Sequence, residues 1–237
     1  ATSLAQMIAD NTLDRAVYIT QPGGALRTET GSPLTLVVVR SSIQDAINVA
    51  TAGDKVNVAA GTYNESVSIN KSVTLTGDRG DPAVAGPGTS APVIDGTGFT
   101  GLPAFKLEAA VDNVTIEGFE IKNYGPDGNT NADGVVAWNP SNNNVIVRDN
   151  YMHHLGYAGV LTGNGWGGPQ GVHDNWQVTY NKVESPIGAY GFDMENVKNS
   201  SISNNEILNI PFYNINVIAL ATESGASVTT ENVVVSN

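Results

Sequence analysis

Short β-type runs, each led by an asparagine, recur along the chain from residue 113 onwards. In residues 144–152, Asn144 leads Val145, Ile146 and Val147, and a second asparagine, Asn150, follows six residues after the first. The leading asparagines are Asn113, Asn144, Asn175, Asn199 and Asn232, at spacings of 31, 31, 24 and 33 residues. A unit that returns at such intervals is typical of a repeat protein, in which each unit buries its apolar face by stacking on the next.

Each unit is a strand, a turn and a strand, with no helical pattern inside it. Asparagine tolerates the left-handed backbone of tight corners, and side chains at equivalent corners can bond each other from coil to coil. We therefore predict an all-β parallel solenoid in which each coil rises by about 4.8 Å. A β-sandwich with Asn-rich turns is the alternative, but a sandwich does not need the same Asn register five times.

The part of the chain before residue 113 divides into two pieces. Residues 43–52 form the clearest helix, because Ile43, Ala46 and Ile47 share one face and Ser42 can cap it with Asp45 three residues on. Residues 1–41 lack the repeat and predict a short helix near residues 4–8 and strands at 15–20 and 35–40. The run 35–40 is either part of the first coil or an edge strand that pairs with another chain.

Four strings in this region resemble the opening of a known family. They are SIQDAINVATAGD (42–54), a strand and corner ending in GTYNE (61–65), KSVTLTG (71–77) and VIDG (93–96). In this order they resemble right-handed parallel β-helix proteins of the pectin-lyase-like superfamily. The resemblance implies one right-handed parallel β-helix over 42–237, of about seven to nine coils, with an N-terminal capping helix and a separate extension at 1–41. The same opening precedes esterases, polysaccharide lyases, epimerases, NosD-type proteins and repetitive cell-surface proteins, so it does not imply one activity.

Composition narrows the classes of partner. The net charge is −12 with 14% charged residues, which argues against nucleic acid and anionic membrane surfaces because both attract clustered Lys and Arg. There is no cysteine, and no run of about 18 apolar residues predicts membrane insertion. The chain begins Ala1-Thr2-Ser3 without Met, as the mature product of signal cleavage would, so we expect a secreted or cell-surface location.

The strands at 134–138, 159–163, 191–195 and 216–220 predict an unusual outer face. If alternation turns Val135, Val160, Phe192 and Val217 inward, their neighbours point outward. The outward set is Val136, Trp138, Leu161, Gly163, Asp193, Glu195, Ile218 and Leu220. This face is expected to form a large apolar patch of the kind that marks interaction sites, unless loops fold over it.

Asp193 and Glu195 are the candidate catalytic pair. Residues two apart on a strand lie about 6.5 Å apart on one face, so the two carboxylates can act as acid and base on a glycosidic bond or bind Ca²⁺. The alternative is two solvated acids on an acidic chain. Candidate substrate-binding residues are Trp138 and Trp166, which can stack on sugar rings, and the basic residues Arg148 and Lys182.

The histidines and the remaining charged residues are weaker candidates for a functional site than Asp193 and Glu195. His153, His154 and His173 are candidates for a metal site or proton transfer, but no H-x-x-x-H spacing is present and alternation places His153 and His154 on opposite sides. Arg148 is expected to stack on Glu117 as a cross-strand ion pair, and Lys182 on Tyr151. The Gln-Asp-Thr and Leu-Gly-Arg-Pro-Trp esterase strings and the Arg-x-Pro-x-x-Arg lyase string are absent, which favours a protein that is not an enzyme.

Two functions remain. The first is a secreted or cell-surface structural protein that associates with itself or with other cell-surface proteins, through the apolar face, an uncapped C-terminal coil or residues 1–41. The second is a carbohydrate-active enzyme, either a polysaccharide lyase or a glycoside hydrolase, or a glycan-binding module. In the second case Asp193 and Glu195 act on the glycan or hold Ca²⁺ as the cofactor.

Overall fold

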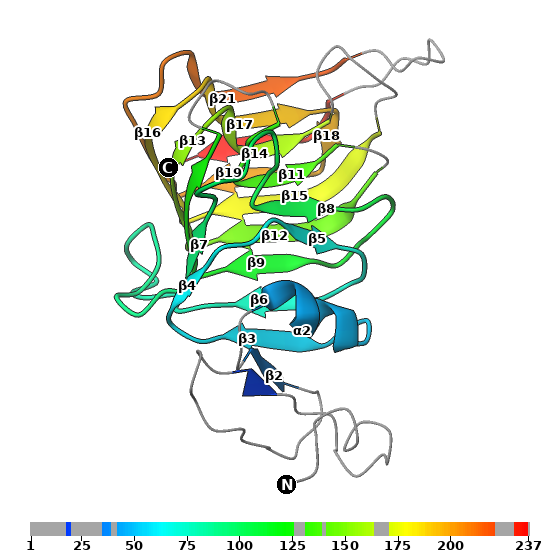
Figure 1. The fold of residues 1–237 in the computed structure, drawn as a ribbon. Coiled ribbons are helices and arrows are strands. Elements are labelled where there is room, and N and C mark those ends of the chain that lie inside the picture. The colour runs from blue at the N-terminus through cyan, green and yellow to red at the C-terminus, as the bar shows by residue number, and fades with distance from the viewer. Residues whose placement is uncertain are drawn as a thin grey trace, which may run out of the picture.

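The computed structural model describes residues 18–19, 35–38, 42–125, 131–138, 141–163, 171–220 and 230–236. Over these residues the protein is all-β apart from one short helix, and every strand pairing is parallel. The strands form three sheets, called here sheets A, B and C, which are stacked in register along one axis (Figure 1). This arrangement is that of a parallel β-helix.

The three sheets have the following strands. Sheet A holds β1 (Tyr18–Ile19), β2 (Thr35–Val38), β3 (Lys55–Val58), β6 (Thr74–Thr76), β9 (Thr115–Glu117), β12 (Asn143–Arg148), β15 (His173–Thr179), β19 (Ser201–Ser203) and β22 (Val234–Ser236), with β18 (Val197–Lys198) beside β15. Sheet B holds β4 (Thr62–Tyr63), β7 (Val93–Asp95), β10 (Glu120–Tyr124), β13 (Tyr151–Leu155), β16 (Lys182–Ile187) and β20 (Glu206–Leu208). Sheet C holds β5 (Val67–Ile69), β8 (Phe105–Leu107), β11 (Val135–Ala137), β14 (Ala158–Thr162), β17 (Tyr190–Glu195) and β21 (Tyr213–Ile218).

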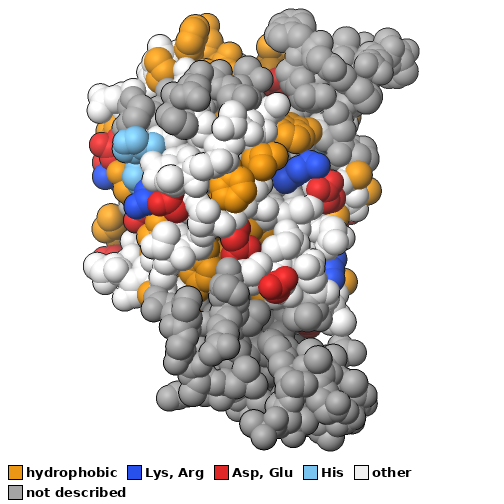
Figure 2. Space-filling view, in the orientation of Figure 1, with side chains coloured by type: hydrophobic (Ala, Val, Ile, Leu, Met, Phe, Trp, Pro, Cys, Tyr) orange, Lys and Arg blue, Asp and Glu red, His pale blue; other side chains and the backbone are white. Residues whose placement is uncertain are grey.

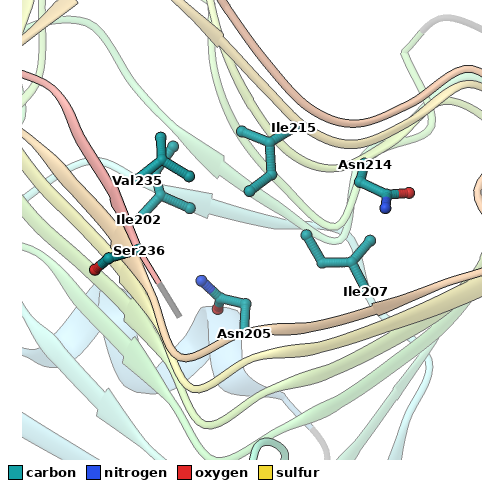
Figure 3. A pocket seen from close by; sticks show the side chains of 7 residues that line it. All are labelled: Ile202, Asn205, Ile207, Asn214, Ile215, Val235 and Ser236. Carbon is teal, nitrogen blue, oxygen red and sulfur yellow. The ribbon is translucent and has the colours of Figure 1, made fainter.

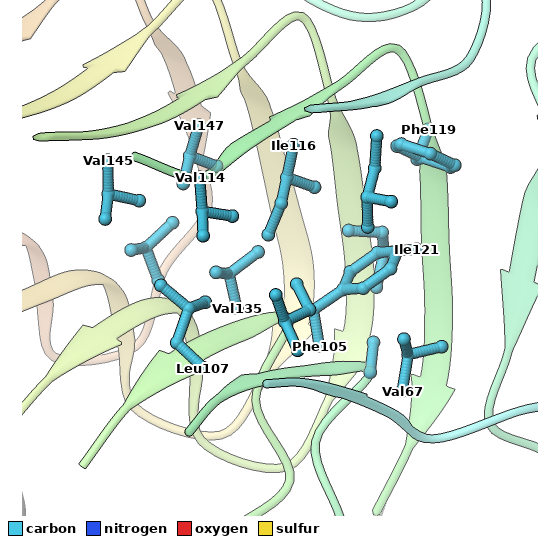
Figure 4. Packing of buried hydrophobic residues seen from close by; sticks show 14 of the residues in the cluster. Val67, Phe105, Leu107, Val114, Ile116, Phe119, Ile121, Val135, Val145 and Val147 are labelled. Carbon is cyan, nitrogen blue, oxygen red and sulfur yellow. The ribbon is translucent and has the colours of Figure 1, made fainter. Parts of the chain in front are cut away.

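The chain visits sheets A, B and C in turn, so the described strands make six three-stranded coils, with β2 before and β22 after them in sheet A. Equivalent apolar positions of successive coils face each other inside. Ile116, Val147, Val178 and Ile202 are consecutive partners in sheet A and are all buried. Figure 4 shows how side chains from the three sheets meet in this core. Each coil therefore buries its apolar positions against the coils above and below it.

The predicted asparagine ladder is present on the outside of the molecule. All five leading asparagines have left-handed backbones, with φ between 48° and 57°. Asn144 donates to Asn113 at 3.2 Å, Asn175 to Asn144 at 2.9 Å, and Asn232 to Asn199 at 3.0 Å. At the short repeat the ladder shifts, because Asn199 donates to Asp174 instead, at 2.9 Å.

A second ladder lies inside the molecule, at the corner between sheets A and B. The side-chain oxygen of Asn150 accepts from Phe119 N–H, that of Asn181 from Asn150 N–H, and that of Asn205 from Asn181 N–H, at 2.8–3.1 Å. Asn150 and Asn181 are fully buried. The second asparagine of each repeat thus satisfies backbone groups that turn away from the sheets at the corner.

Helix α2 (Ile43–Val49) begins where the sequence predicts and ends three residues earlier than the predicted 43–52. Ser42 Oγ accepts from Asp45 N–H at 3.1 Å, as expected of the cap. The carboxylate of Glu65 completes it, accepting from Ile43 N–H at 2.6 Å and Gln44 N–H at 3.0 Å. The helix string and the GTYNE string therefore belong together because the second supplies an acceptor for the first turn of the helix.

The N-terminal strands extend sheet A. β2 pairs in register with β3, from Thr35 with Lys55 to Val38 with Val58, and β1 pairs with β2. The run predicted at 35–40 is therefore part of the sheet. The helix expected near residues 4–8 lies outside the described residues.

A long loop of residues 77–92, between β6 and β7, folds back over the corner of sheets A and B. Gly86 N–H donates to Tyr180 O at 2.9 Å, three coils further along the axis. The loop passes close to Gly118, whose φ is 80°, and a Cβ there would lie 2.7 Å from the carbonyl carbon of Asp78. Glycine at 118 is therefore required by the close approach.

Within the described residues, no helix is of the length and apolar character needed to cross a bilayer.

Candidate functional site

The outer face of sheet C carries the predicted carboxylates in a continuous row across four coils. Val136, Leu161, Asp193 and Asn216 are consecutive partners along β11, β14, β17 and β21. Asn216 thus lies beside Asp193, and Ile218 lies beside Glu195. The row changes from apolar to polar as it approaches the C-terminal coil.

The apolar half of this row is covered. Val136 is fully buried and Leu161 is 4% exposed, and both pack with Ala158 beneath Trp138, Tyr157 and Tyr190. Leu220 is also buried. Of the two alternatives for this face, an exposed apolar patch or a covered one, the structure shows the covered one at Val136 and Leu161, where aromatic side chains of the same face pack against them.

Asp193 is buried on the same face. It is 2% exposed, accepts from Asn216 Nδ2 at 2.8 Å, and accepts from Tyr157 Oη at 3.3 Å. Burial raises the pKa of the Asp193 carboxyl, although both donors act to lower it. Glu195 is 3% exposed. Asp193 and Glu195 are therefore buried, and the alternative of two solvated acids on an acidic chain is wrong.

A third carboxyl, Asp133, was missed by the sequence analysis. It precedes β11, is fully buried, and accepts from Ala158 N–H at 3.0 Å through Oδ1, whereas Oδ2 has no hydrogen-bond partner among the described residues. Burial raises its pKa well above the usual value, and the charge of Asp193 adds to that rise. The only signal in the sequence is an acid directly before a strand that is apolar on both faces, which is too common to single out.

Aromatic rings form a row along the outside of this site. Tyr157 and Tyr190 are 5.3 Å apart and edge-on, and Tyr190 and Tyr213 are 6.0 Å apart and stacked, with an interplanar angle of 14°. Tyr213 is 59% exposed. Trp138 contributes from the edge of the face, with Lys106 Nζ 5.5 Å from its ring. Trp166, also predicted to bind substrate, lies outside the described residues.

The two predicted basic residues lie on other sheets, so the structure does not bring them to Asp193. Arg148 is in sheet A, where the predicted pairing with Glu117 is confirmed at 2.7 Å. Lys182 is in sheet B, next to Tyr151 as predicted, with Nζ 5.3 Å from the ring and 3.7 Å from Glu184.

The outer face of sheet B holds a separate group of ionisable side chains. Glu120 Oε1 contacts Lys122 Nζ at 3.0 Å and His153 Nε2 at 3.2 Å. His153 Nδ1 is 2.6 Å from His154 Nδ1. Alternation predicted that the two histidines point to opposite sides, which is wrong because the left-handed backbone of His154, with φ 54°, keeps both outside.

His173 does not join them. It faces inward and is fully buried, its Nδ1 accepts from Asn142 N–H at 3.1 Å, and its ring meets Trp176 edge-on. Burial lowers the pKa of His173 to about 4. In the part of the chain that the structure describes, no group of three or more His, Asp or Glu side chains is arranged so that it could hold a metal ion.

The C-terminal coil exposes apolar side chains. Phe212 is 70%, Val234 59% and Val235 53% exposed. A cavity of about 310 Å³ opens between the last strands (Figure 3), and it is lined by Ile202, Asn205, Ile207, Asn214, Ile215, Val235 and Ser236. Hydrophobic side chains also gather at this upper end in Figure 2, where Figure 1 places β21.

Comparison with known proteins found no matching family model, no matching curated protein and no matching solved structure.

Proposed function

We propose that this chain is a structural module of a secreted or cell-surface protein, with a β-helix of the pectin-lyase-like type, that associates with a second copy of itself through the apolar surface of its C-terminal coil. The observation that carries the proposal is the exposure of Val235. It continues the buried inward row of Ile202 in sheet A, yet it is 53% exposed and lines the cavity of the last coil.

The direction of the strands in sheet A supports a second copy of the chain as the partner. Within the described residues the strands of sheet A are parallel from β1 to β22, so the outer sides of these two strands run in the same direction and suit pairing between two copies. Such head-to-tail contacts are heterologous and lead to open filaments unless they close into a ring. An edge strand beside apolar side chains is a known template for this kind of pairing.

The test is the solution mass by light scattering over a range of protein concentrations. The proposal expects growth beyond the 24.7 kDa chain as concentration rises. Val235→Glu places a charge in the apolar surface and should abolish this growth. Val84→Glu is the matched control, because Val84 is 58% exposed on the loop 77–92, and it should leave the growth unchanged. A monomer at every concentration would overturn the proposal.

A second candidate is a glycan-binding or glycan-cleaving module on sheet C, and the row of Tyr157, Tyr190 and Tyr213 favours it. Tyr213 is exposed and stacks on the half-buried Tyr190, and an exposed ring beside hydrogen-bonding groups suits the apolar faces and hydroxyls of sugars. The burial of Asp193 and Glu195 supports binding more than catalysis, and the role of Ca²⁺ there stays a proposal. Retention on neutral polysaccharides that Tyr213→Ala weakens would support it, and indifference to a broad panel would argue against it.

A further inference from the structure

The loop 77–92 carries the tripeptide Arg79-Gly80-Asp81 on its exposed part. Residues 79–84 are all exposed, and in Figure 1 the loop stands out from the stacked coils beside β4 and β7. A cation and an anion separated by one glycine offer a partner two points of contact. Because a tripeptide is short and occurs often by chance, the way in which the fold presents it decides whether it can bind.

The guanidinium of Arg79 is fixed on one side and open on the other. Its Nε donates to Asp149 Oδ2 at 2.7 Å, and among the described residues this is the only hydrogen bond that the side chain makes. The side chain is 42% exposed. A guanidinium has five N–H donors, so the two terminal nitrogens keep theirs for a carboxylate of a partner. Asp149 therefore orients Arg79 and leaves its outer donors available.

The carboxylate of Asp81 is open as well. Its Oδ1 accepts from Ala83 N–H at 2.9 Å, whereas Oδ2 has no hydrogen-bond partner among the described residues. Val84 N–H donates to Asp81 O at 3.0 Å and closes a turn that has Pro82 at its second position. The proline fixes the backbone that follows Asp81. An exposed carboxylate oxygen on such a turn is a suitable ligand for a hard divalent cation held by a partner.

Gly80 joins the two charged residues in a fixed conformation. Its φ is 68°, and its N–H donates to Asp78 Oδ1 at 3.1 Å. Asp78 also accepts from the opposite arm of the loop, from Gly88 N–H at 2.7 Å and Ser90 N–H at 3.2 Å. A Cβ at Gly80 would lie 2.7 Å from Gly88 N, so only glycine fits there. The tripeptide is therefore preorganised, which lowers the entropy cost of binding.

We propose that Arg79, Gly80 and Asp81 form a docking site for a receptor that combines an acidic groove for the guanidinium with a divalent cation for the carboxylate. Integrins recognise an exposed Arg-Gly-Asp with this chemistry. The site goes beyond the proposed self-association, because the loop lies at the corner of sheets A and B and the assembly surface is the C-terminal coil. It rests on the proposed function only for the extracellular location, where such a receptor meets the chain.

The test is surface plasmon resonance of the full chain against the ectodomains of integrins that bind Arg-Gly-Asp peptides, first in Mn²⁺ and then in EDTA. The expected result is saturable binding in Mn²⁺ that EDTA abolishes and that a linear Arg-Gly-Asp peptide inhibits. Val235→Glu is measured beside the wild type, because this variant lacks the apolar contact of the proposed assembly but keeps the loop. Failure of the assembly and failure of the docking site are thereby distinguished.

Asp81→Glu is the decisive variant, since it keeps the charge but moves the carboxylate by one methylene. It should weaken binding by at least about 30-fold, as the loss of a central contact does. Asp45→Glu is the matched control, the same change at an exposed position of helix α2, and it should leave binding within about twofold. Arg79 is less suitable for the test, because it also pairs with the buried Asp149.

Circular dichroism of each variant verifies that the fold is kept. The proposal is overturned if the wild-type chain binds none of these ectodomains in Mn²⁺, if binding persists in EDTA, or if Asp81→Glu binds as the wild type does.

Discussion

Arg79 Nε donates to Asp149 Oδ2 at 2.7 Å, joining two residues that are 70 positions apart in the chain. Asp149 lies at the buried corner between β12 and β13, and its side chain is 1% exposed. Arg79 lies on the loop 77–92 and also approaches Glu117 at 3.7 Å. The loop thus brings the Arg79 cation to the buried carboxylates of Asp149 and Glu117. Sheet A itself supplies Arg148 as the other nearby cation.

Arg79→Ala should lower the free energy of unfolding by about 2 kcal/mol, because it leaves the Asp149 carboxylate buried without its ion partner. Urea unfolding followed by circular dichroism measures this. Lys182→Ala is the control, since its contact with Glu184 is long, at 3.7 Å, and partly open to solvent, and should contribute less than about 1 kcal/mol. Equal losses for the two variants would contradict a special role for the loop.

The inner asparagine ladder should matter far more for stability than the outer one. Asn181→Ala removes a buried side chain that accepts from Asn150 and donates to Val147 O, so a loss of about 3 kcal/mol is expected from the unpaired backbone groups. Asn175→Gly removes one exposed bond and keeps a residue suited to φ 56°, so less than about 1 kcal/mol is expected. Similar losses in urea unfolding would show that both ladders act alike.

His173 should make the protein sensitive to mild acid. Its pKa is about 4 when folded, against an unperturbed value of about 6.5, so the unfolded chain binds the proton more readily. The free energy of unfolding that neutral His173 contributes is present in full above pH 6.5. It falls by up to about 3 kcal/mol as the pH decreases towards 4. Thermal or urea unfolding of wild type and His173→Gln between pH 4 and 8 measures this.

The difference between these two proteins isolates His173, because the other titrating groups are common to both. The wild type should lose more stability than His173→Gln between pH 6.5 and 4. Parallel pH profiles would mean that His173 is not neutral in the folded protein.

Asp133 should act in the opposite direction. Burial raises its pKa above the unfolded value, so the folded state favours the protonated form and loses stability as the pH rises through the raised pKa. Asp133→Asn keeps an oxygen for Ala158 N–H and cannot ionise. It should therefore stabilise the protein more at pH 8 than at pH 4.

Asp81→Asn is the control for that experiment, since Asp81 is exposed and its replacement removes one carboxylate in the same way. Unfolding at the two pH values by either denaturant or heat is sufficient. An Asp133→Asn variant that is equally changed at both pH values would show that the carboxyl does not titrate in this range.

The pairings of neighbouring coils were largely readable from the sequence. Repeat spacing and strand alternation predicted the pairs Glu117–Arg148 and Tyr151–Lys182. They also predicted the left-handed corners at Asn144 and Asn175. Both are local properties, because a strand turns each side chain by a fixed amount and each repeat returns to the same register. A left-handed residue interrupts that rule, which is why His154 was placed on the wrong side.

The amino-acid pattern by itself determined the all-β solenoid, the asparagine corners and the helix that begins at Ile43, since these follow from periodicity and local backbone preference. Only the tertiary structure decided that Glu65 completes the cap of that helix, that Asp133 and Asp193 share a buried environment, and that Arg79 reaches Asp149. These contacts join coils or loops whose separation along the chain varies, and their strength depends on burial. The spacing of residues along the chain predicts neither their distance in space nor their burial from water, so both could be known only from the folded molecule.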